Sequence, residues 1–182
     1  MHRLRFYRNL TPLGVSLVLL IFMTVGAAIA APSEITKRLR AAEPIGEASF
    51  RLLGAELYRA QLFTEGGADF EVDQPYSLAL VYERSIKGST LIKATLREMR
   101  RMEGKRADHA EIAEKLNDCF QSVKEGDRYS AIPRGQSVVE FWRNGALRCS
   151  LSHPGIRDRI MGIWLSDQSR DPNLSRQLRG QS

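Results

Sequence analysis

The sequence predicts an α+β fold in which helices pack on one face of an antiparallel sheet. Strand-like and helix-like segments come in separate runs: strands before residue 83, two helices between 90 and 123, strands again to 151, and two helices at the end. Asn144-Gly145 stands between two short apolar runs and is typical of a two-residue β-hairpin. Tyr76–Tyr82 is apolar at successive positions, which indicates a strand covered on both faces in the middle of the sheet.

The N-terminal segment has the three parts of a secretory signal. Arginines and no acidic residues occur before the apolar core Leu13–Val25, and Ala28-x-Ala30 offers small residues for cleavage. We therefore predict a signal peptide over residues 1–30 and an exported, periplasmic protein, which meets the membrane only through this segment. The alternative is an uncleaved anchor, because Leu10–Ala31 approaches the length that spans a bilayer.

The composition after the signal is that of one ordinary domain. The 182 residues include 27 Lys and Arg against 21 Asp and Glu, a net charge of +6, and three of the arginines lie in the signal. The remaining charges are interspersed, and no arginine-aromatic block suggests a nucleic-acid groove, so we expect no nucleic-acid partner. We expect residues 31–44 to be a charged lead-in, either a tether or a peripheral turn, and residues 45–182 to form the folded domain.

Alternation of polar and apolar residues predicts the first strands. In Ile45–Leu53, the polar positions Glu47, Ser49 and Arg51 alternate with the apolar positions Ala48, Phe50 and Leu52. Gly54-Ala55 interrupts the pattern, and Glu56–Thr64 is predicted as a second strand that ends at the turn residues Glu65-Gly66-Gly67. Tyr76–Tyr82 is the third strand.

Helical spacing follows these strands. Thr90–Met102 has apolar residues on one face and basic residues on another, and Gly104 ends it. Asp108 stands three residues before Glu111, a pattern typical of a capping box, and the apolar spacing then continues to Val123.

The remainder of the chain repeats the order of strands and then helices. Strands are predicted over residues 128–132, 137–143 and 146–151. Pro154 is placed to begin a helix, and Asp171-Pro172 to begin the last one.

No motif for catalysis or metal binding stands out. Cys119 and Cys149 are the only cysteines, and an exported protein can form a disulfide, but the spacing leaves open two buried thiols instead. The three histidines are scattered, and none lies at metal-ligand spacing, so we predict no metal. The chain has no nucleophile, phosphate-loop or dinucleotide motif, and we expect no cofactor and no catalytic residue.

Several sequence blocks between Gly46 and Gly180 carry a family resemblance. The blocks are Leu57–Phe63, Pro75–Tyr82, Glu98–Arg101, Val123–Asp127, Phe141–Gly145 and Gly162–Leu165, followed by Pro172, Leu174, Leu178 and Gly180. In their order and spacing the chain resembles the bacterial chalcone-isomerase-like proteins, exported relatives of the plant chalcone isomerase fold. The resemblance implies an open sheet covered by a layer of helices.

The resemblance does not extend to the catalytic residues of the plant enzyme. Gly88 matches the glycine that opens the helix after the third strand, and Leu91 then stands where the enzyme keeps its tyrosine. Glu98 falls near the place of an expected asparagine, and Arg51 is the candidate for the early-strand arginine. We therefore expect a non-catalytic member.

Some members of the wider fold bind fatty acids between the sheet and the helices, with an arginine holding the carboxylate. The resemblance implies that this chain binds a fatty acid or a similar amphipathic small molecule, with Arg51 as anchor and Tyr58, Tyr82 and Leu91 as lining. The alternative is that Arg51 faces solvent and the aromatic side chains belong to the core.

Two other functions stay open. An interaction module of the cell envelope, without a small ligand, would use Trp142 and Trp164 if they are exposed. A true isomerase or lyase acting on an unidentified substrate would need an acid–base pair, and only Glu98 and Arg51 are candidates for it.

Overall fold

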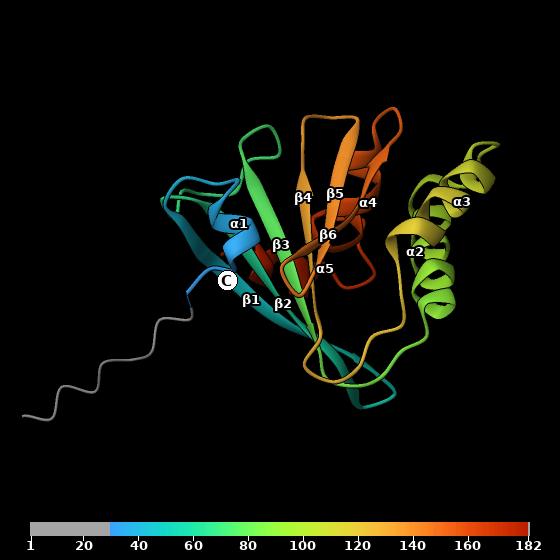
Figure 1. Ribbon diagram of the computed structural model, residues 1–182, viewed down its shortest axis with the longest axis horizontal. Coiled ribbons are helices and arrows are strands. Elements are labelled where there is room, and N and C mark those ends of the chain that lie inside the picture. The colour runs from blue at the N-terminus through green and yellow to red at the C-terminus, as the bar shows by residue number, and fades with distance from the viewer. Residues whose placement is uncertain (1–29, 182) are drawn as a thin grey trace, which may run out of the picture.

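A six-stranded antiparallel sheet forms the centre of the computed structural model, which describes residues 30–181 (Figure 1). The strands are β1 (Ala42–Leu52), β2 (Ala55–Glu65), β3 (Tyr76–Tyr82), β4 (Arg128–Pro133), β5 (Val138–Arg143) and β6 (Ala146–Ser152). They lie in the sheet in chain order, so each strand pairs with its neighbours in sequence. Nearly all of the expected signal peptide lies outside the described residues.

Helices cover both faces of this sheet, but unequally. They are α1 (Ser33–Thr36), α2 (Gly88–Glu103), α3 (His109–Cys119), α4 (Ile156–Leu165) and α5 (Pro172–Leu178). The short helix α1 lies in front of the sheet in Figure 1, whereas α4 and α5 lie behind it. The predicted α+β class is confirmed. Within residues 30–181, no helix is both long enough and apolar enough to cross a membrane.

The middle strand β3 is buried on both faces, as its continuous apolar run predicts. Leu78 and Leu80 belong to the large core between the sheet and helices α2 to α5. Ala79 points the other way, into a smaller core that it shares with Ile35 and Ile132 beneath α1. The sheet therefore separates two apolar clusters of different size.

The lead-in segment is packed against the sheet. Ile35 is fully buried in the smaller core, and the neighbouring carboxylate of Glu34 is fully buried as well. That carboxylate accepts hydrogen bonds from Ser130 Oγ at 2.7 Å and from Arg128 Nε at 3.1 Å. The segment is therefore not a free tether: a short helix and turns are held to the sheet by a buried ion pair and apolar contacts.

Helix α3 is shorter than its apolar spacing predicts. It ends at Cys119, and Phe120 is extended with φ of −104° and ψ of 114°. Val123 instead forms an isolated antiparallel bridge with Ile86. The apolar spacing continues past the helix because the extended segment also reaches the core.

Of the predicted helix starts, Asp108 is the N-cap of α3 but lacks the predicted capping hydrogen bond, and Pro154 lies before its helix. Asp108 makes no capping hydrogen bond, because its carboxylate accepts hydrogen bonds from the Arg159 guanidinium, with Nη1 at 2.9 Å. Pro154 precedes the helix, and α4 begins at Ile156. The predicted start at Asp171 is confirmed, because its side chain accepts hydrogen bonds from the first backbone amides of α5.

The two cysteines form a disulfide. Cys119 and Cys149 are joined across a Cα–Cα distance of 5.0 Å. The bond ties the last residue of α3 to β6, at the edge of the sheet. The sequence alone was compatible with a disulfide or with two buried free thiols, and the structure has the disulfide.

Candidate functional site

A small apolar cavity lies between the sheet and the helices. Its volume is about 30 Å³, and its lining is apolar and aromatic, namely Leu78, Leu80, Tyr82, Phe120, Tyr129, Ala131, Phe141 and Trp164. The strands β3, β4 and β5 supply its floor, and Phe120 and Trp164 come from the helical side. A space of this volume holds one water-sized group, so most of the cleft is filled by side chains.

Aromatic rings surround this cavity in edge-to-face contacts. The ring centroid of Tyr82 lies 5.7 Å from that of Tyr58 and 6.4 Å from that of Tyr129. Phe120 lies 5.0 Å from Phe141 and 5.7 Å from Tyr129. Edge-to-face pairs of this kind are favourable, each worth about 0.5–1.5 kcal/mol beyond the area that it buries. Phe120 and Tyr58 are the half-buried members of this set, and Phe120 lies on the extended segment that follows α3.

One polar group lies at the rim of the aromatic set. Trp164 Nε1 donates a hydrogen bond to the Tyr58 hydroxyl at 2.9 Å. Burial raises the pKa of Tyr58 to about 12, so the phenol stays protonated at neutral pH. Its hydrogen makes no hydrogen bond to an acceptor within residues 30–181 and is available to a ligand oxygen.

The structure brings together some of the residues predicted for ligand binding. Tyr82 is buried and lines the cavity, and Tyr58 contacts it edge to face. Leu91 lies on α2 and packs, half-buried, against the large core, but it does not line the cavity.

Arg51 is separated from this group. Its side chain is 65% exposed at the end of β1, and its Nη2 lies 3.2 Å from the carboxylate of Glu56. The same carboxylate accepts a hydrogen bond from Ser49 Oγ at 2.9 Å. Phe50, between the two, stacks on Tyr58 at 5.0 Å. The guanidinium is thus held by Glu56 at the surface, and the role of Arg51 as an anchor stays a prediction.

Glu98, the candidate acid–base residue, is held as an anion. Burial alone would raise the pKa of Glu98, but hydrogen bonds from Arg170 and Arg101 outweigh it and keep that pKa below its ordinary value. Arg101 Nε lies 2.8 Å from the carboxylate. A carboxylate with a lowered pKa is a weak base, whereas a general base works best with a pKa near the working pH. This geometry supports a structural ion pair between α2 and the residues before α5.

The sequence pattern does not identify Phe120 as a lining residue. The apolar spacing that continues to Val123 instead predicts that Phe120 lies on the core face of a helix. Its position after the last helical residue, beside the bonded Cys119, depends on a pairing that the sequence left open. Within residues 30–181, no group of three or more His, Cys, Asp and Glu side chains could hold a metal ion.

Comparison with solved structures identifies the architecture. A crystal structure of a fatty-acid binding protein from Arabidopsis thaliana superimposes with a TM-score of 0.60, over 78% of this chain and 88% of that chain, at 10% sequence identity. This is the chalcone-isomerase-like fold. At this identity the likeness concerns the fold alone, and it agrees with the open sheet and helical layer that the sequence implied.

Sequence comparison adds one bacterial relative. An uncharacterized protein of Haemophilus influenzae is 25% identical over 143 residues, which cover 77% of this chain and 69% of that protein. No protein-family model matches the chain. This relative adds no function.

Proposed function

We propose that this protein is a non-catalytic, exported carrier that binds a fatty acid or a similar amphipathic small molecule between the sheet and the helices. The observation that carries the proposal is the apolar cavity in that cleft, lined by aromatic side chains from both layers. Ligand sites of this type are concave, mostly apolar and supplied with a few polar groups. Tyr58 and Trp164 provide such groups at the rim.

The closed cleft has to widen when the ligand enters. Small-molecule sites occupy roughly 300–1,000 Å³, and the cavity measures about 30 Å³. The half-buried Phe120 contacts Tyr129 and Phe141 only edge to face, so an acyl chain can take the place of its ring. The carrier thus opens by moving Phe120 while the sheet stays unchanged.

Export is supported by two features of the chain. The arginines, apolar core and small residues of the N-terminal segment form a signal pattern. The Cys119–Cys149 disulfide fits an oxidising compartment such as the periplasm, because disulfides are rare in the reducing cytoplasm.

Arg51 is the proposed anchor for the ligand carboxylate. To act in this way its guanidinium has to leave Glu56, 3.2 Å away, and turn toward the face of β1 that carries Phe50. Because the pair is largely exposed, breaking it costs at most about 1 kcal/mol. A buried carboxylate would compensate for that cost through a bidentate contact.

Native mass spectrometry of the protein, purified without detergent from the exported fraction, tests the proposal. We expect an added mass that matches a fatty acid. After the bound ligand has been removed, added laurate should bind and give the mass of a laurate complex. Ala131→Val, which adds methyl groups to the cavity wall, is expected to abolish the added mass, because Ala131 lines the cavity. A bare mass that laurate does not change would reject the carrier function.

Two matched variants separate the anchor from the cleft. Arg51→Ala is expected to weaken laurate binding by roughly tenfold. Arg59→Ala removes a comparably exposed arginine, paired with Glu83 at 2.8 Å, and is expected to leave binding unchanged. Equal effects of both variants would reject Arg51 as the anchor but leave the cleft assignment in place.

Neither candidate contact of the interaction-module alternative is an exposed tryptophan. Trp164 is only 8% exposed and belongs to the large core. Trp142 is partly buried against the smaller core and lies beneath the Arg38 guanidinium, 5.8 Å from its ring centroid. Neither tryptophan forms an exposed aromatic patch, so the carrier function is favoured.

A further inference from the structure

A second and larger cavity opens at the end of the sheet where β3 begins and β4 ends. Its volume is about 400 Å³, within the range of small-molecule sites. Its lining is Arg38, Leu39, Val72, Asp73, Gln74, Pro75, Tyr76, Ile132, Pro133, Arg134, Gly135 and Arg157. None of these residues lines the cavity between the sheet and the helices. We call this second cavity the strand-end pocket.

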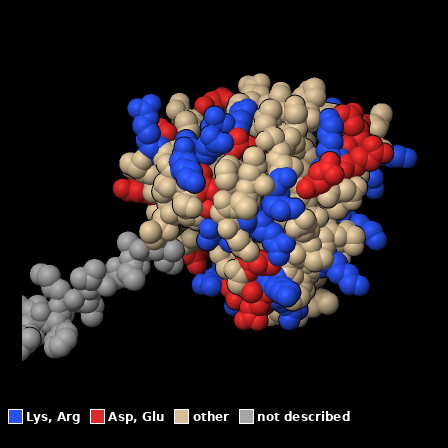
Figure 2. Space-filling view, in the orientation of Figure 1, with Lys and Arg blue, Asp and Glu red and all other residues tan. Residues whose placement is uncertain are grey.

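The charges of the strand-end pocket are mainly positive. Arg38, Arg134 and Arg157 line it, against the single acidic residue Asp73. Over the face of the molecule that carries α1, by contrast, basic and acidic side chains are interspersed (Figure 2). The remaining lining is mostly apolar, from leucine, valine, isoleucine and proline side chains. The pocket thus combines an apolar wall with cationic groups.

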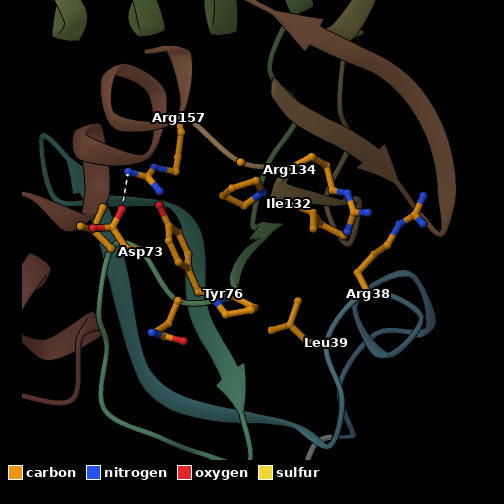
Figure 3. A pocket seen from close by; sticks show the side chains of 12 residues that line it. Arg38, Leu39, Asp73, Tyr76, Ile132, Arg134 and Arg157 are labelled. Carbon is orange, nitrogen blue, oxygen red and sulfur yellow. Dashed lines mark hydrogen bonds and ion pairs between the residues drawn. The ribbon is translucent and has the colours of Figure 1, made fainter. Parts of the chain in front are cut away.

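A lining residue of this pocket, Tyr76, carries a buried hydroxyl without a partner among the described residues. Tyr76 is 2% exposed, and its hydroxyl oxygen makes no hydrogen bond within residues 30–181. In Figure 3 the oxygen lies toward the guanidinium of Arg157. Burial raises the pKa of Tyr76, so the group is a neutral phenol that can donate a hydrogen bond. An unsatisfied buried hydroxyl is costly to the fold, which suggests that a ligand provides its partner.

Arg157 is fixed beside this hydroxyl with donors to spare. Its side chain is 8% exposed, and it donates from Nε to Asp158 at 2.7 Å and from Nη2 to Asp73 at 3.1 Å. Its Nη1 makes no hydrogen bond to any described residue. A carboxylate could therefore accept hydrogen bonds from Arg157 and from Tyr76 together.

Asp73 competes with such a carboxylate for the charge of Arg157. Its side chain is 75% exposed, so its ion pair with Arg157 is weak and easily exchanged. Arg134 and Arg38 stand across the pocket, as Figure 3 shows. Both are near Glu140, with Arg38 bound at 3.2 Å and Arg134 at 3.9 Å. Glu140 partly balances the charges of Arg38 and Arg134, so Arg157 and Tyr76 form the end of the pocket that suits a carboxylate better.

The geometry points to a second binding site, for a small organic carboxylate, in which Tyr76 and Arg157 hold the carboxylate and the apolar wall holds the body of the ligand. The site is independent of the proposed carrier cleft, because the two cavities share no lining residue. The apolar wall, which includes Leu39 and Ile132, selects against ligands that consist of a charge alone.

Hexanoate is the probe for the first experiment, with the full protein followed by NMR chemical shifts of backbone amides. We expect saturable shifts at Asp73, Tyr76 and Arg157. Hexanamide, the uncharged analogue, and inorganic phosphate are expected to bind at least tenfold more weakly. Absence of shifts at these positions would overturn the proposal. Equal binding of hexanamide would show that no carboxylate is recognised, and equal binding of phosphate that the apolar wall has no role; either result would also overturn it.

Two variants should change hexanoate binding in opposite directions. Tyr76→Phe removes the unpaired hydroxyl and is expected to weaken binding roughly tenfold, because it deletes one hydrogen bond to a charged group. Asp73→Asn removes the negative charge that competes for Arg157 and is expected to strengthen binding severalfold. Unchanged affinity in both variants would reject Tyr76 and Arg157 as the carboxylate site.

Matched controls exclude general effects of charge and folding. Asp167→Asn removes an aspartate that is 76% exposed and paired with the largely buried Arg179, the same arrangement as Asp73 with Arg157. It is expected to leave hexanoate binding unchanged. Tyr76→Phe should fold normally, since the hydroxyl has no partner to lose. Laurate binding in the cleft should also persist in Tyr76→Phe, so each site can fail without the other.

Discussion

Gly46 sets how closely β1 and α5 approach each other. A Cβ atom at this position would lie 2.2 Å from the backbone oxygen of Leu178 and 2.3 Å from that of Gln177. These are main-chain atoms of α5 and the end of its last turn, so they cannot rotate away as a side chain could. Position 46 therefore requires glycine, because β1 and α5 approach too closely for any side chain.

Gly46→Ala is expected to lower the free energy of unfolding by about 1–3 kcal/mol, because the added methyl group forces α5 away from the sheet. Urea denaturation measures the change. Gly162→Ala is the control, since a Cβ atom there meets no atom closer than 3.7 Å and alanine favours the helix. A loss of stability in Gly162→Ala as large as that in Gly46→Ala would contradict the steric explanation.

The Cys119–Cys149 bond fixes α3 and the segment after it to the edge of the sheet. It closes a loop with a sequence separation of 30 residues. We expect the double variant Cys119→Ser, Cys149→Ser to lose roughly 2–4 kcal/mol of unfolding free energy, since the unfolded chain gains freedom. Urea denaturation of the oxidised protein and of the variant gives the difference. Two free thiols in the denatured, exported protein would show that the bond does not form.

Strands and helices could be predicted from the sequence where the spacing of apolar residues matches the spacing of buried positions in a strand or a helix. Tyr76–Tyr82 is a strand with the predicted bounds, because an unbroken apolar run fits a strand covered on both faces. The same periodicity extended α3 too far, since Phe120 and Val123 reach the core from an extended segment. Burial sets the pattern, and it does not distinguish a helix from a strand that enters the same core.

Contacts between distant residues were beyond the reach of sequence patterns. Glu34 reads as a solvated charge, yet it is buried with Arg128, 94 positions away. Arg51 is placed in a strand as expected, but its pairing with Glu56 depends on how the hairpin closes. Tyr76 reads as core, and only the structure shows that its hydroxyl has no partner in residues 30–181. Pattern and resemblance therefore predicted the fold and part of the cleft lining, such as Tyr82, whereas the strand-end pocket is visible only in the structure.

At the scale of the whole molecule, buried and paired carboxylates join the helices to one another and to the sheet. Glu103 of α2 accepts hydrogen bonds from two other helices. Arg159 of α4 donates from Nε to Oε2 at 2.9 Å, and His109 of α3 donates from Nε2 to Oε1 at 2.7 Å. Burial alone would raise the pKa of Glu103, but these hydrogen bonds outweigh it and hold that pKa below its ordinary value. Asp127, at the start of β4, follows the same rule: hydrogen bonds from Asn144 and the Lys124 amide lower its pKa to about 2.

These lowered pKa values predict that the fold is lost in acid. A carboxylate whose pKa is lower in the folded state stabilises the fold above its unfolded value, 4.5 for Glu103, and loses that contribution as the pH falls through the folded value. Urea midpoints should therefore decrease from pH 5 down to about pH 2.

Glu103→Gln should be less stable than the parent protein at neutral pH, and its midpoint should fall less steeply in acid. Glu114→Gln is the control, because Glu114 is exposed and forms no ion pair within residues 30–181; its curve should match that of the parent. A parent curve that is flat between pH 5 and pH 2 would mean that these ion pairs do not stabilise the fold.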